Sequence, residues 1–336
     1  MWHRHSCLCS SALYYPTPRM HYDALIERDL AAIPSVITSF RADHTADETW
    51  TVVTRFAVLA FAPSQHSKHA LLSCLSAWDL REELGEQFDQ AMIECAIYAA
   101  ASRQPWSEPP ILDPPKLDDA QRGDLGELRE AIASSDRLRA ERWLAKRYRD
   151  ADFAHDYFTA ASDSFEDLGH SLIVAETAWR LARLLGEQGR YAMLRVGMWE
   201  MVANGNRLPA AGGRNTDLES LCAALVSKII ANGGDIISTH TIFLFDAALQ
   251  TGDELVIARV AEQLSHIEPA KSPTTDARRP APEPYSFARD YGSCLKAHAV
   301  AKRLRPRFPN VDFDPMLVAV QHNLETAPSS EEMTFA

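Results

Sequence analysis

The stretch HALLSCLSAWDLREELGEQFDQAMI, residues 69–93, recurs without a gap as HSLIVAETAWRLARLLGEQGRYAML, residues 170–194, and the prediction of the fold starts from this repeat. The two stretches share eleven of twenty-five positions, whereas unrelated sequences of average composition would share roughly one or two. Each stretch is typical of a helix that begins at its histidine, ends at a glycine and precedes a second helix. We therefore predict an internal duplication of histidine-led helix pairs, with copies at about residues 65–102 and 169–203.

The histidines that open the two copies, His69 and His170, are predicted to point into the protein. On a period of 3.6 residues, His170 lies on the same helical face as Ile173 and Leu181. A fainter third copy opens near His240, whose face also carries Phe243. Inward-pointing histidines at equivalent places are the feature that any functional interpretation must explain.

The rest of the chain has the same helical character. Alternating β-branched runs are absent, and 46% of the residues are hydrophobic, which is enough for a large core. We predict an all-α fold with a single large helical domain over residues 20–326. Residues 1–19 are an N-terminal extension, ordered or disordered, and residues 327–336 are a frayed tail. Within the domain, Pro34 is expected to break or kink a helix over residues 22–40.

Composition and charge exclude several classes of function. A net charge of -12 and an isoelectric point near 5.5 argue against a nucleic-acid or membrane partner, since such binding relies on clustered Lys and Arg. No apolar run approaches the roughly eighteen residues needed to span a bilayer. The six scattered cysteines form neither a disulfide framework nor a paired metal motif. The expected location is the cytoplasm.

The histidines suggest a metal site. Imidazole is a common ligand of iron, copper and zinc, and inward histidines from several helices can converge on one ion. The paired Glu-x-x-His motifs of di-iron proteins are missing, which favours a mononuclear site. The alternative is that each histidine caps its helix or bonds a backbone carbonyl in the core. The candidate ligands are His66, His69, His170, His240, His298 and Lys296.

Lys296 and His298 are not expected to bind one ion together, because residues two apart on a helix point about 200° apart. We favour His298, since an ammonium group cannot ligate a metal, and expect Lys296 to reach solvent or an acid. Trp78 and Trp179 follow their histidines by nine residues and are expected in the core, where they would line or support a cofactor pocket. Glu176 is the candidate catalytic acid behind the ligands.

Four motifs in the chain resemble the questin oxidase-like family. They are QHSKHALLSCLSAW, GHSLIVAETAWRLARLLG, STHTIFLFDAAL and SCLKAHAVAKR, which begin at residues 65, 169, 238 and 293. The resemblance implies an all-α fold with several histidine-led helices. It also implies an oxygen-using enzyme that opens or cleaves aromatic polyketide rings, with non-haem iron in at least some members.

The resemblance also carries over single residues. The early Asn-His of the family falls on Gln65-His66, its Gly-His on Gly169-His170, and its later histidine and lysine on His240 and Lys296. The chain departs from the family in two places. It has Lys68-His69 where the family has Pro-Met, and it has Glu176-Thr177 where the family often has a further histidine.

These observations predict a metal-dependent oxidoreductase. More specifically, they predict a non-haem iron oxygenase that uses Fe(II) and dioxygen on an aromatic or quinone-like, polyketide-type small molecule. The alternative is a non-enzymatic, all-helical interaction module whose histidines are caps. The two hypotheses differ in geometry, because the enzyme requires that His69, His170 and His240 face one interior space, whereas the module predicts histidines that do not converge.

Overall fold

The computed structural model describes residues 29–61, 67–102, 114, 123–205, 217–265 and 293–326. These residues form α-helices and one short 3-10 helix, without a strand, so the prediction of an all-α fold is confirmed. The elements are α3 Ile33–Asp43, α4 Ala46–Ala60, α5 Ser67–Asp79, α6 Arg81–Leu84, α7 Gln87–Ser102, α8 Leu125–Ala133, α9 Arg137–Arg147, α10 Phe153–Ala161, η2 Asp167–Gly169, α11 His170–Leu185, α12 Glu187–Asn204, α13 Leu218–Ala231, α14 Ile236–Thr251, α15 Glu254–Leu264, α16 Ser293–Leu304 and α17 Asp314–Thr326.

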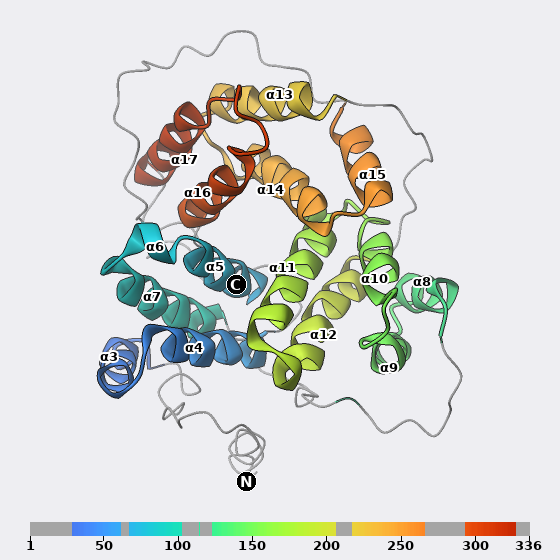
Figure 1. Ribbon diagram of the computed structural model, residues 1–336, viewed down its shortest axis with the longest axis horizontal. Coiled ribbons are helices and arrows are strands. Elements are labelled where there is room, and N and C mark those ends of the chain that lie inside the picture. Colours follow the sequence, from blue (N-terminus) through green and yellow to red (C-terminus); the bar gives the residue numbers. More distant parts are fainter. Residues whose placement is uncertain are drawn as a thin grey trace.

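Four helices, α5, α11, α14 and α16, form an inner ring around a common axis in the middle of the molecule (Figure 1). Each packs against the next, and α16 closes the ring on α5. In α5, α11 and α14 the residues that face the axis lie three, six and seven positions after the histidine, which is His69, His170 or His240. The inner helices therefore run in the same direction and in register, with their histidines at one level.

Outer helices cover the inner ring. Each inner helix packs against a later helix of the chain: α5 against α7, α11 against α12, α14 against α15 and α16 against α17. This enclosure explains why the inner helices are buried on all sides rather than along one stripe. In α11 every residue from His170 to Ala178 is buried, and in α14 every residue from Ile242 to Leu249.

Two helix starts near the N-terminal end of the described chain follow from their local sequence. Pro34 occupies the first turn of α3, where its missing N–H costs no hydrogen bond. In the described residues α3 begins beside this proline and continues to Asp43, so Pro34 does not kink it, and residues 22–28 of the expected first helix lie outside the described residues. The next helix, α4, begins with a capping box in which Thr45 and Glu48 each accept a hydrogen bond from the other's backbone N–H.

Both copies of the repeated stretch form helix pairs. Gly85 and Gly186 separate the helices with φ of 51° and 74°, a backbone region that favours glycine. The two copies differ at Leu80. There the chain of the first copy ends α5 and forms α6, a helix of one turn, before Gly85. The duplication itself remains a prediction from the sequence.

A close approach of α11 and α12 requires glycine at position 197. A Cβ atom there would lie 2.0 Å from Tyr157 Oη and 2.8 Å from Ala175 Cα. We expect Gly197→Ala to lower the free energy of unfolding by about 2–3 kcal/mol, because two packed helices must separate. Urea unfolding followed by circular dichroism measures the loss. Gly189→Ala in the same helix is the control, since its Cβ would meet only Leu185, at 3.5 Å. Equal losses in the two variants would contradict this account of the packing.

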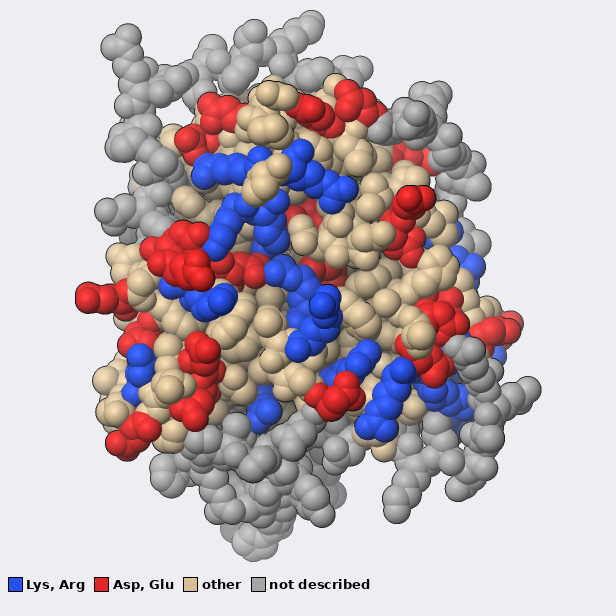
Figure 2. All heavy atoms as spheres, in the orientation of Figure 1, with Lys and Arg blue, Asp and Glu red and all other residues tan. Residues whose placement is uncertain are grey.

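The surface mixes charges of both signs. On the face seen in Figure 2, Lys and Arg side chains gather over the inner ring, with Asp and Glu side chains next to them. Among the described helices, none is long and apolar enough to cross a membrane.

Candidate metal centre

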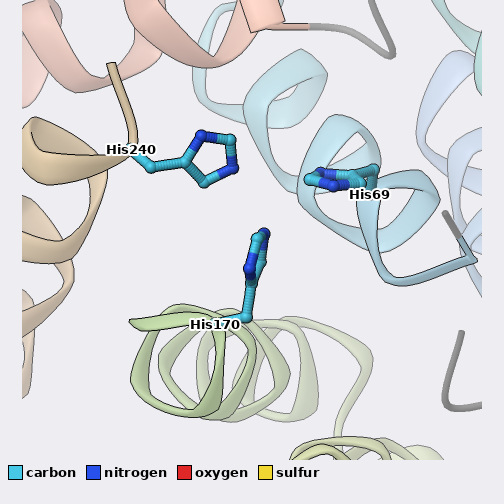
Figure 3. A group of neighbouring side chains, drawn as sticks. All are labelled: His69, His170 and His240. Atoms are coloured by element: carbon cyan, nitrogen blue, oxygen red, sulfur yellow. The ribbon is translucent and has the colours of Figure 1, made fainter. Parts of the chain in front are cut away.

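Three histidines meet on the axis of the inner ring. His69 of α5, His170 of α11 and His240 of α14 point toward one interior space (Figure 3). Their ring centroids are 4.8–5.9 Å apart, and one nitrogen of each ring lies within 4.8 Å of the others. All three residues are buried. The prediction that these histidines face a shared space is confirmed, and we call them the histidine triad.

Backbone carbonyls fix the tautomer of two members of the triad. His170 Nδ1 bonds the carbonyl oxygen of Asp167, and His240 Nδ1 bonds that of Ile236 at 2.6 Å. A carbonyl oxygen only accepts, so Nδ1 carries the proton in both rings. In a neutral ring Nε2 then carries the lone pair, and both Nε2 atoms are buried without a hydrogen bond to any described residue. This is the state in which a histidine binds a metal through Nε2.

A strained turn delivers the carbonyl that orients His170. Asp167, Leu168 and Gly169 have φ of 48°, 57° and 80°. The left-handed region costs about 1–2 kcal/mol for a residue with a side chain. Two such residues, followed by Gly169, place the Asp167 carbonyl against the imidazole at the start of α11. Strain of this kind is characteristic of functional sites.

A buried lysine connects two of the ligand-bearing helices. Lys68, next to His69 in α5, donates to the carboxylate of Asp167 and to Glu200 Oε1 at 2.9 Å. The contact of Asp167 with His170 holds the pKa of its carboxyl below the ordinary range, and Lys68 lowers it further. Lys68 therefore links the start of α5 to the turn before α11.

Burial keeps two members of the triad, His69 and His240, neutral. Burial and then the charge of Lys296 lower the pKa of His69 well below 6.5. Burial, followed by the neighbouring His170, lowers the pKa of His240 to about 3. Neutral imidazole is the form that binds metal ions. His69 and His240 therefore need not lose a proton when an ion binds at neutral pH.

The spacing of the triad is close to that of a metal site. Three nitrogens bound to one ion at about 2.1 Å lie about 3.0–3.6 Å apart, compared with separations of up to 4.8 Å here. Ring rotations that bring the nitrogens inward by up to about 1 Å would complete the coordination. Three imidazoles occupy three positions and leave further positions for other ligands.

Lys296 of α16 takes the fourth place at the level of the triad. Its Nζ lies 3.1 Å from His69 Nδ1 and 5.9 Å from the ring centroid of Phe243. The sequence-based preference for His298 is therefore reversed, since the structure brings Lys296 to the triad. His298 lies elsewhere on α16, where burial and then Arg305 lower its pKa to about 4. The expected angular separation of the two residues explains why only one reaches the axis.

A small cavity continues the axis beyond the triad, and we call it the axial cavity. Each of the four inner helices contributes three lining residues. Leu72, Ile173 and Phe243 lie nearest to the triad in sequence, and Lys296 also faces the cavity. A volume of about 30 Å³ is open to the centres of water molecules, which is room for about two of them.

Glu176 lines the axial cavity among four other charged groups. Arg303 donates to Asp246 at 2.5 Å and also contacts Asp79, to which Arg180 donates at 2.6 Å. Glu176 Oε1 lies 3.5 Å from Arg180 Nε, but it accepts no hydrogen bond from a described residue. Burial raises the pKa of Glu176 to about 7, against the opposing effect of Arg180 and Arg303. Glu176 can therefore exchange a proton near neutral pH.

The ion pairs of Arg303 are expected to stabilise the fold. Arg303→Met keeps most of the side-chain volume but leaves Asp246 without its buried cation. We expect the free energy of unfolding to fall by about 3–5 kcal/mol, the usual cost of breaking a buried ion pair. Urea unfolding measures the change. Lys302→Met on the same helix is the control, because the Lys302 side chain is 40% exposed and pairs with the equally exposed Glu83. A loss no larger than that of the control would show that the Arg303 pairs are dispensable.

The remaining predicted site residues lie away from the triad or outside the described chain. His66 lies outside the described residues. Trp78 packs on Trp50 with ring centroids 4.3 Å apart, and Trp179 packs on Phe158 at 5.9 Å. Both tryptophans are partly buried and pack against the core rather than lying within it, and neither lines the axial cavity.

Sequence reasoning missed Lys68, Asp246 and Arg303. A regular offset could have revealed two of them. Asp246 follows His240 by six positions, as Glu176 follows His170, and Arg303 follows Lys296 by seven. Residues at these offsets share a face with the ligand one or two turns earlier.

The fold and the site define a class: an all-α protein with a buried site of three histidines. No protein-family model, curated protein or solved structure matches the chain. The site itself therefore carries the functional argument.

Proposed function

We propose that this protein is a metal-dependent oxidoreductase whose ion is held by the histidine triad. One observation carries the proposal, namely the two buried Nε2 lone pairs of His170 and His240, which face a third imidazole. Buried polar atoms are nearly always hydrogen-bonded in native proteins. A cation bound between the rings would satisfy both lone pairs at once.

Fe(II) is the proposed ion, and an aromatic or quinone-like, polyketide-type molecule is the proposed substrate, with dioxygen as the oxidant. These three assignments rest on the motifs that resemble the questin oxidase-like family. Bound iron would supply the redox chemistry that no amino-acid side chain provides. Three imidazoles also suit copper or zinc, so the metal must be identified by measurement.

The axial cavity limits where the substrate can bind. Room for about two water molecules is enough for dioxygen and too little for an aromatic ring. We therefore propose that the organic substrate reaches the triad from another side. Glu176, with its pKa of about 7, is the proposed catalytic acid and base, because a group that titrates near neutral pH can both donate and accept a proton.

The alternative of an interaction module with capping histidines has one supporting observation. His170 and His240 do bond backbone carbonyls near the starts of their helices. That hypothesis, however, predicts histidines that do not converge. It also gives no reason for two Nε2 lone pairs to meet in a buried space, so we prefer the enzyme.

Elemental analysis of untagged protein tests the proposal. After expression with added iron and anaerobic purification, we expect about one transition-metal ion per chain, because three ligands from rigid helices form a pre-organised site. A content below about a tenth of an ion per chain would overturn the proposal, provided that anaerobic incubation with Fe(II), Cu(II) or Zn(II) does not restore it. The same measurement identifies the metal.

A further inference from the structure

One oxygen of the Glu176 carboxyl group, Oε1, is buried without a hydrogen bond to any described residue. The residue is 4% exposed and lines the axial cavity. Among the described residues nothing donates to Oε1, and the nearest cation, Arg180 Nε, lies 3.5 Å away without the alignment of a hydrogen bond. Because an unsatisfied buried oxygen is costly, Oε1 requires a partner from within the cavity.

The axial cavity provides that partner if it contains water. Ser76, Thr177 and Lys296 line it along with Glu176, so polar groups occur on more than one side. A water molecule in a protein interior needs two to four polar partners, and these side chains supply them. Lys296 Nζ, which lies 3.1 Å from His69 Nδ1, places one donor beside the triad. Glu176 lies at the other end of the cavity, among its charged groups. Polar groups therefore occur along the length of the cavity, from the triad to Glu176.

The charged groups around Glu176 lead toward the surface. They are Asp79 of α5, Arg180 of α11, Asp246 of α14 and Arg303 of α16. Without Glu176 these two cations and two anions balance, so a neutral Glu176 leaves the cluster neutral. The side chains of Asp79 and Arg180 are 12% and 23% exposed. This pair therefore connects the buried carboxyl group to solvent.

We propose that the axial cavity holds a chain of about two water molecules, through which Glu176 passes protons between the histidine triad and the surface at Asp79. In each transfer, the Glu176 carboxyl gives its proton to a cavity water, which passes one of its own protons toward the triad. The carboxylate then regains a proton from solvent on the Asp79 side. No electron moves in these steps. The proposal rests on the proposed function only in taking the triad as the reacting centre.

The water chain is tested first by a crystal structure with ordered solvent. We expect two water molecules in the axial cavity, one within hydrogen-bond distance of Glu176 Oε1 and one of Lys296 Nζ. A cavity without density for water would overturn the proposal.

Proton transfer is tested by infrared spectroscopy of the carboxyl groups. At pH 5 the wild type should show a band of a protonated buried carboxyl that is lost in Glu176→Gln and kept in Glu141→Gln, a buried acid bonded to Arg195 outside the cavity. In D₂O this band should shift within the mixing time. Filling the cavity with Ala247→Leu should slow the shift by more than about tenfold, because exchange must then wait for local unfolding. If the leucine variant does not fold, Ala247→Val serves the same purpose with a smaller added volume.

Two outcomes would overturn the proposal. One is a slow shift in the wild type, and the other is a fast shift in a folded, filled variant. Zn(II) added alone then tests the link to the triad, because a bound dication should shift or weaken the Glu176 band. A protein that binds zinc without any change of the band would contradict that link. A protein that binds no metal but exchanges the Glu176 proton quickly would contradict the proposed function and leave the water chain intact.

Discussion

Replacing His170 with alanine is expected to reduce the metal content from about one ion per chain to below about a tenth, and to weaken the affinity by more than about a hundredfold. Altering a group that merely supports a ligand already weakens the metal affinity ten- to a hundredfold, so the loss of a ligand itself should weaken it further. His170 is the clearest choice, because its Nδ1 proton is fixed by the Asp167 carbonyl and its Nε2 has no other partner among the described residues. Competition with a chelator measures the affinity.

The control for this experiment is His298→Ala. Like His170, His298 is a largely buried histidine with an Nε2 that bonds no described residue, but its charged neighbours are Arg305 and Asp314 rather than the triad. We expect its metal content to equal that of the wild type. If His298→Ala lost the metal while His170→Ala kept it, the triad would not be the site. Circular dichroism of both variants checks that the helices remain.

Replacing Glu176 with glutamine is expected to make the protein more stable than the wild type at pH 8. From pH 4 to pH 8, the free energy of unfolding of the variant should rise relative to that of the wild type by up to about 3 kcal/mol. The carboxyl has a native pKa of about 7, compared with 4.5 for an ordinary glutamate side chain. As the pH rises from 4.5, the unfolded chain releases this proton while the native protein keeps it. Native stability therefore falls up to about pH 7 and then levels off. Glutamine has no proton to lose, so the variant avoids this decline.

Urea unfolding of both proteins at several pH values measures the effect. All other titrating groups are the same in the two proteins, so the difference between the two curves isolates Glu176. Glu187→Gln, at an exposed position in the first turn of α12, controls for the removal of one negative charge from a chain of net charge -12. A difference between Glu176→Gln and the wild type that does not change with pH would show that the pKa of Glu176 is the same in the native and the unfolded protein.

Much of the fold could be predicted because helix periodicity and helix boundaries are local properties. The spacing of apolar residues identified the repeated helix pairs, and Gly85 and Gly186 marked their turns. The helix boundary at Pro34 has a local cause as well. Proline disrupts a helix interior but is favoured in the first turn, and apolar spacing alone did not show on which side of Pro34 the helix began.

The candidate site was predicted in part. His69, His170 and His240 could be found because each stands near the start of an apolar helix. The choice between Lys296 and His298 failed for a different reason. The chemical preference of metals for imidazole was applied to two residues that cannot both face the axis, and the orientation of α16 decided which of them does. That orientation depends on the packing of α16 against α5, α14 and α17.

The helical character of the chain and the inward orientation of three histidines could be predicted from sequence alone, because both properties depend on residues within one or two turns of each other. The common direction and register of the inner helices, in contrast, depend on tertiary packing. This arrangement places the histidines at one level and puts Glu176, Asp246 and Arg303 together around the far part of the cavity. The physical reason is that register and direction are set by contacts between residues far apart in the chain. His69 and Lys296, 227 positions apart, touch only because the ring closes.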